Sequence, residues 1–165
     1  MVNDLIKIIQ AMVTVHQTLN DLAVAKQDAV KKGDMKDLEA VMQKEAPLIQ
    51  KLRKLENTRM HLISQWQDEK GLVKEGVTID QLLPLFPEKE SRELEAWSTR
   101  LIEQMIRLKE QNDLNEQLLE DSLRFVNVTL DAMRPQNHFN NYSGNGPEDD
   151  DDFKSGDHSL FDSKA

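Results

Sequence analysis

Residues 5–34 read LIKIIQAMVTVHQTLNDLAVAKQDAVKKGD, and this stretch decides the fold class. Its mostly apolar positions recur at alternating steps of four and three residues, which is the pattern of a helix that packs along one stripe. The stripe consists of Leu5, Ile9, Met12, His16, Leu19, Ala23 and Val30. Two lysines and a glycine then favour a helix C-terminus, and Asp34 is a suitable N-cap for a second helix. The stretch therefore predicts a helix over about residues 3–32, a short turn and an antiparallel neighbour.

Two more long helices are expected beyond this turn. The same spacing predicts a helix over residues 35–70, in which Pro47 should kink the backbone without ending the helix. Residues 71–87 contain two glycines and two prolines, which indicates a connection, and Thr78 is placed there to cap a short helical turn over 79–83. A third long helix is expected over residues 88–133. The predicted fold is all-α, an antiparallel helical bundle or coiled coil of three long helices.

The composition changes beyond residue 133. Residues 134–165 are rich in Asn, Gly, Asp and Ser, contain seven acidic and three basic residues, and include the unbroken acidic run 148–152. A segment of this composition lacks the apolar surface that would offset the entropy of ordering it. We therefore predict two parts, a helical domain over residues 1–133 and a disordered acidic tail over residues 134–165.

Composition and charge narrow the classes of function. The chain has no cysteine, which excludes disulfides, thiolate metal sites and cysteine nucleophiles. A formal net charge of −9, with lysine and arginine interspersed among the acids, disfavours binding to nucleic acid or to an anionic membrane surface. The sequence shows no signal-peptide pattern and no long apolar run, so we expect no membrane insertion and a cytoplasmic location. Protein partners remain as the expected ligands.

Residue types suited to catalysis or metal binding are present but are not arranged for it. The four histidines lie far apart in the sequence, and no two have the spacing of a helical zinc pair. Glu116 and Glu120 share one helix face, but solvated acidic faces are common and no apolar pocket is predicted to raise the pKa of either carboxyl. Phosphate-binding loops and nucleophile motifs do not occur. The sequence therefore predicts no enzyme, no metal site and no cofactor.

The lengths of the long helices predict an overhang. At 1.5 Å per residue the helix over 35–70 is ~54 Å long and the helix over 88–133 is ~69 Å long. If these two pair from one end, residues 124–133 project past the first turn. Apolar residues near this end occupy more than one helix face, namely Leu114, Leu118, Leu119, Leu123, Phe125, Val126, Val128, Leu130 and Met133. The segment then binds another protein, or it folds back on the bundle or forms a homodimer.

Three stretches carry a family resemblance. Residues 113–125 read DLNEQLLEDSLRF, residues 141–144 read NYSG, and residues 160–165 read LFDSKA. With the helix order and Gly33-Asp34 at the first turn, they resemble the FlgN family of flagellar export chaperones, and the ending is similar to that of a Bacillus member. The resemblance covers essentially the whole chain.

The resemblance implies a function and a site. It implies a cytoplasmic chaperone that binds hook–filament junction (hook-associated) proteins, prevents their premature assembly and delivers them to the gate of the flagellar type III export apparatus. The implied client-binding residues are Asn115, Leu118, Leu119, Ser122, Leu123, Phe125, Val126 and Leu130. The implied docking residues for the export apparatus are Asn141, Tyr142 and Gly144, although the inserted acidic run sets this tail apart from the family pattern. The alternative function is a structural coiled-coil homodimer or adaptor without chaperone activity.

Overall fold

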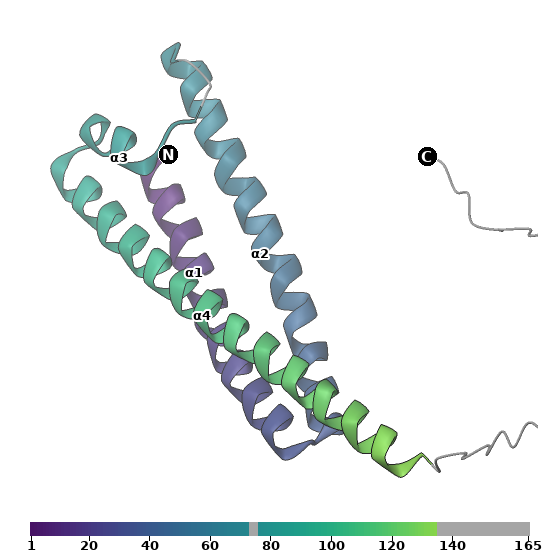
Figure 1. Ribbon diagram of the computed structural model, residues 1–165. Helices are drawn as coiled ribbons and strands as arrows, with labels where there is room; N and C mark the ends of the chain where they lie inside the picture. Colours follow the sequence, from purple (N-terminus) through teal and green to yellow (C-terminus); the bar gives the residue numbers. More distant parts are fainter. Residues whose placement is uncertain (73–75, 135–165) are drawn as a thin grey trace, which may run out of the picture. The chain divides into compact units, whose positions relative to one another are not determined.

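The first two long helices form a hairpin (Figure 1). In the computed structural model, which describes residues 1–72 and 76–134, α1 spans Val2–Lys32 and α2 spans Met35–Lys70. Gly33 ends α1 with a φ of 66°, a conformation that glycine adopts without steric cost. The Asp34 side chain then caps α2 by accepting a hydrogen bond from the amide of Asp37 at 3.0 Å. The turn is therefore made by the two residues expected to make it.

Removal of this cap should loosen the start of α2. We expect Asp34→Ala to lower the free energy of unfolding by about 1 kcal/mol, because the amide of Asp37 loses its acceptor. Urea unfolding followed by circular dichroism measures the loss. Asp34→Asn keeps a side-chain oxygen at the cap and should retain most of the stability, so an equal loss in both variants would contradict the cap as the cause.

A short helical segment joins α2 to the last long helix. α3 spans Ile79–Leu82, the 3₁₀ helix η1 spans Leu83–Leu85, and α4 spans Glu88–Met133. At the start of α3 the Gln81 side chain accepts a hydrogen bond from the amide of Thr78 at 3.0 Å. The described residues are all-α, as the sequence predicts, but the count of three helices is incomplete, because the helical turn of the connection is a fourth α-helix. α2 continues through Pro47.

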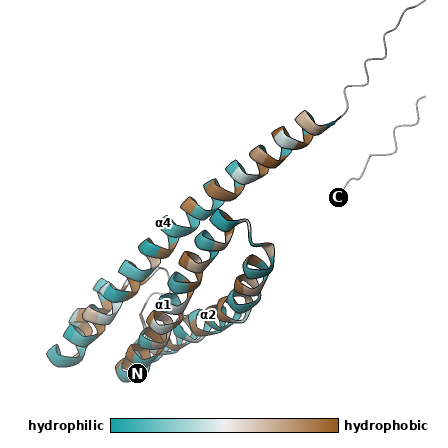
Figure 2. Ribbon diagram, turned by 90° about the horizontal axis from the view of Figure 1, so that it is seen from below, coloured by the Kyte–Doolittle hydropathy of each residue, from teal (hydrophilic) through white to brown (hydrophobic). Residues whose placement is uncertain are grey.

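α1 is the central helix, and it lies between α2 and α4 (Figure 2). It pairs with α2 in antiparallel orientation and with α4 in parallel orientation, since the hydrogen-bonded pairs Asn20–Gln104 and Gln27–Gln111 advance in the same direction on both helices. No Cα atom of α2 lies within 8 Å of one in α4. The pairing assumed in the length argument is therefore wrong, because α4 packs on α1. The physical reason is that α1 buries a second stripe, which includes Ile6 and Val13, beside the predicted one.

The apolar core fills the end of the bundle where α3 lies. Its buried members are Leu5, Ile6, Ile9, Met12, Val13, Ile63, Trp66, Leu82, Leu94 and Leu101. Trp66 also lies against Phe86, with ring centroids 5.6 Å apart. Toward the α1–α2 turn the packing is sparser, because Val41 is the one buried residue of α2 before Ile63. The helices are therefore tightly packed at the α3 end of the bundle and loosely packed near the α1–α2 turn.

The predicted tail begins where the described part of the chain ends. The helices belong to one unit, Met1–Met133. Residues 135–165, which make up the predicted disordered tail apart from Arg134, lie outside the described residues. The tail assignment stays a prediction.

Candidate partner-binding surface

α4 continues past the α1–α2 turn (Figure 2). We call residues 124–133 of α4 the overhang. At least half of each large apolar side chain in it is exposed, and these side chains are Phe125, Val126, Val128, Leu130 and Met133. Exposed apolar residues gathered in one segment contribute little to the stability of the bundle and are typical of an interaction surface.

Where α4 passes the turn, the two enclose an open hollow of about 580 Å³, which we call the turn hollow. α4 contributes Leu118, Leu119, Asp121, Ser122, Leu123, Phe125 and Val126, and the turn contributes Val30, Lys31, Lys32, Gly33 and Met35. The lining is mainly apolar, and the charged side chains come from two lysines of the turn and Asp121. A hollow of this size is within the range of ligand-binding pockets, so it has room for several side chains of a partner.

The structure brings together six of the eight predicted client-binding residues. The six that line the turn hollow are Leu118, Leu119, Ser122, Leu123, Phe125 and Val126. Leu130 lies farther along the overhang and is exposed. Asn115 is different, because it is only 2 % exposed and lies between α1 and α4. The predicted docking residues Asn141, Tyr142 and Gly144 lie outside the described residues.

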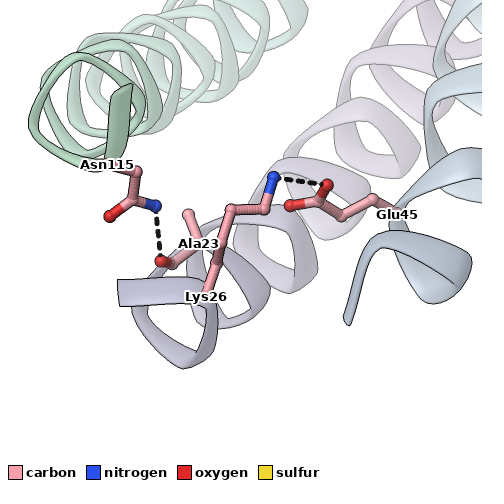
Figure 3. Close-up of polar contacts among 4 residues, drawn as sticks. All are labelled: Ala23, Lys26, Glu45 and Asn115. Carbon is pink, nitrogen blue, oxygen red and sulfur yellow. Dashed lines mark hydrogen bonds and ion pairs between the residues drawn. The ribbon is translucent and has the colours of Figure 1, made fainter. Parts of the chain in front are cut away.

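Asn115 belongs to a row of amide side chains between α1 and α4, which we call the amide ladder. Its members are Asn20, Gln27, Gln104, Gln111 and Asn115. The Asn115 side chain donates from Nδ2 to the carbonyl of Ala23 at 2.8 Å (Figure 3), and its Oδ1 accepts from Gln111 Nε2 at 3.0 Å. Such directed hydrogen bonds are satisfied in one register of two helices. The amide ladder therefore sets how far α4 extends past the turn.

A metal-binding cluster and a membrane-spanning helix are both absent from the described residues. Within residues 1–72 and 76–134, no three His, Asp or Glu side chains gather as they would to hold a metal ion. Among the helices of this part of the chain, none has the length and apolar character needed to cross a membrane. What the overhang and the turn hollow provide is apolar contact area with charges at the rim.

Comparison with known proteins identifies the family. Residues 1–149 match the family described as FlgN protein. The chain belongs to the FlgN family. This FlgN-family chain is also 30% identical over 161 residues to a Bacillus subtilis (strain 168) protein named Uncharacterized protein YvyG, an alignment that covers 98% of this chain and 97% of the other. No solved structure matches the chain significantly.

The sequence-based prediction of the FlgN site omits the turn side of the hollow. In the sequence, Lys31 and Lys32 indicate only the end of the first helix, and Met35 follows the cap without belonging to a predicted stripe, yet all three line the turn hollow. The signal that finds them is geometric. The pairs Asn20–Gln104 and Gln27–Gln111 set a register in which the end of α1 lies level with about residue 116, so α4 continues past the turn and the turn residues lie beside it.

Proposed function

We propose that the protein is a cytoplasmic chaperone of flagellar type III export that binds hook–filament junction proteins. Membership of the FlgN family supports a role in flagellar export. The observation that carries the proposal is the overhang with the turn hollow beside it, an apolar surface at the end of a bundle whose core lies elsewhere. A chaperone of this kind has to expose such a surface while its own fold stays intact.

The proposed mechanism is helix addition. An amphipathic helix from a terminus of the client lays its apolar face on the overhang and inserts side chains into the turn hollow. Leu118, Leu119, Leu123, Phe125 and Val126 supply the apolar contacts. The client helix is thereby hidden from other copies of the client, which prevents premature assembly. The mechanism involves no catalysis, metal or cofactor.

Delivery to the export apparatus is assigned to the tail. We propose that Asn141, Tyr142 and Gly144 form the docking segment, on the basis of the family resemblance of residues 141–144. Asn115 is left out of the client-binding surface, because its side chain is buried and engaged in the amide ladder.

Calorimetric titration of the full-length chain with terminal helical segments of hook-associated proteins from the same organism tests the proposal. We expect saturable binding with a negative change in heat capacity, because apolar surface is buried on association. A central domain of the same junction protein, without its termini, is the control and should not bind. If every terminal segment fails to bind and light scattering shows a stable homodimer, the structural coiled-coil alternative is favoured instead.

A further inference from the structure

A second apolar groove runs along the bundle between α2 and α4. No Cα atom of α2 lies within 8 Å of one in α4, so these two helices form the walls of the groove. α1 lies between them and forms the floor. Two hollows of about 390 and 520 Å³ share Leu52 and together form what we call the α2–α4 groove. Its apolar lining includes Met12 and Leu19 from α1, Ile49 and Leu52 from α2, and Met105 and Leu108 from α4. The groove is thus a seam that the three long helices leave open.

The shape of this groove fits a helix. Three helices around an open seam leave the position that the fourth helix takes in a four-helix bundle. The lining extends along α4 from Leu101 to Leu123, which is ~33 Å or about 23 helical residues. An extended segment would find no backbone groups to pair with, because the helices that form the walls use their own internally.

Four charged residues in the groove neutralise each other. Lys26 of α1 pairs with Glu45 of α2 at 2.8 Å (Figure 3), and both side chains are largely buried. Arg59 and Glu56 pair within α2 at 2.7 Å, and the hydrogen bond from Arg59 lowers the pKa of the Glu56 carboxyl. These cations are therefore already matched by carboxylates of the groove itself.

Two further carboxylates leave the groove with an excess of negative charge. Glu116 and Glu120 lie one turn apart on α4 at the end near the overhang, and neither forms an ion pair with any described residue. An occupant with basic side chains at this end is attracted, and an acidic one is repelled. The repulsion disfavours two occupants that the protein itself could supply, which are the end of α4 from a second copy and the segment that follows residue 134. Residues 118–133 of a second copy carry three acidic residues and one basic residue, and residues 135–165 carry seven acidic residues and two lysines.

We propose that the α2–α4 groove binds an amphipathic helix of a partner protein, about 20 residues long, with Lys or Arg at the end that faces Glu116 and Glu120. This site is separate from the proposed client surface, because it needs neither the overhang nor the α1–α2 turn, although Leu119 and Leu123 border both. The chain then holds two helical segments at once, either from one partner or from two. The inference does not depend on the identity of the client.

The test uses the full-length chain and synthetic fluorescent peptides of about 20 residues. One peptide is an amphipathic helix with lysines near one end, a second has glutamate in place of these lysines, and a third has the composition of the first in an order without an apolar stripe. Fluorescence anisotropy should show saturable binding of the basic peptide and roughly tenfold weaker binding of the acidic one, the effect of two exposed ion pairs. The third peptide should not bind.

Charge-reversed variants test the role of the two glutamates. The double variant Glu116→Lys, Glu120→Lys should bind the basic peptide roughly tenfold more weakly and the acidic peptide more tightly. The control is the double variant Glu95→Lys, Glu110→Lys, which changes the net charge equally at exposed positions of α4 outside the groove. Equal weakening in both double variants would overturn the proposal, because the effect would then be one of net charge.

Matched apolar variants test the location. Met105 lines the groove and is 49 % exposed, whereas its neighbour Ile106 is 53 % exposed and is not among the residues that line the groove. Met105→Glu should abolish peptide binding, and Ile106→Glu should leave it unchanged. Phe125→Glu, in the turn hollow, should also leave it unchanged, so that a failure of the client-binding proposal and a failure of this one are told apart. The proposal is overturned if the basic peptide shows no saturable binding, or if the free chain is a dimer that Met105→Glu dissociates.

Discussion

Replacement of Leu123 by glutamate should weaken binding of a junction-protein terminus by at least ~2 kcal/mol, about 30-fold, the scale of an interface hot spot. Leu123 lines the turn hollow and is 63 % exposed, so a charge there is solvated in the free protein and is buried only when the client covers it. The melting temperature should therefore stay within a few degrees of that of the unmodified chain. Calorimetric titration and thermal unfolding on the same variant give the two quantities.

The control for Leu123 lies on the same helix. Val128 is 67 % exposed and belongs to the overhang but does not line the turn hollow, so Val128→Glu should weaken binding much less. Phe125→Glu should resemble Leu123→Glu, because Phe125 also lines the turn hollow. A Leu123→Glu variant that unfolds, with no binding defect separable from the loss of structure, would remove this position from the client surface.

Truncation of Leu94 to alanine should have the largest effect on stability. Leu94 has no exposed surface and packs in the core cluster at the α3 end of the bundle. Its truncation should lower the free energy of unfolding by about 3 kcal/mol, since the transfer free energy is lost and a cavity remains. The expected fall in melting temperature is roughly 10 °C. Thermal and urea unfolding both measure it.

Ile106→Ala is the matched comparison for Leu94→Ala. Ile106 lies on the same helix but is more than half exposed, so its truncation should change stability by about 0.5 kcal/mol or less. A loss in Ile106→Ala as large as that in Leu94→Ala would contradict the explanation by burial, because the two residues would then differ in exposure but not in their contribution to stability.

The ends of the helices were predictable because local residues set them. Gly33 and Asp34 act through their own backbone and side-chain geometry, and each does so in the structure as the sequence indicates. The choice of neighbour for α4 was not predictable in this way. Helices α1 and α2 both carry stripes with four- and three-residue spacing, and only the second buried stripe of α1, with Ile6 and Val13, distinguishes them.

The exposed apolar part of the candidate site was predictable from the sequence, whereas the burial of Asn115 was not. Apolar residues on several faces indicate a surface without a fixed neighbour, and Leu123 and Phe125 are exposed as that argument requires. Asn115 stands next to these residues in the sequence, yet its side chain is buried and engaged with Ala23 and Gln111. The burial of Asn115 depends on the facing helix α1 and not on the residues beside it in the sequence. The residue pattern of α4 therefore does not predict it.

The amide ladder also has a consequence for the order of events during synthesis. Its hydrogen bonds between α1 and α4 join residues that are 84 and 92 positions apart. A ribosome adds about 5–20 residues per second, so the polar groups of α1 wait roughly 4–18 s for their partners on α4. Contacts between α1 and α2 join segments that follow each other in the chain, whereas the register of α4 waits for distant residues. The length of α4 that projects past the turn is therefore set only after α4 itself has been made.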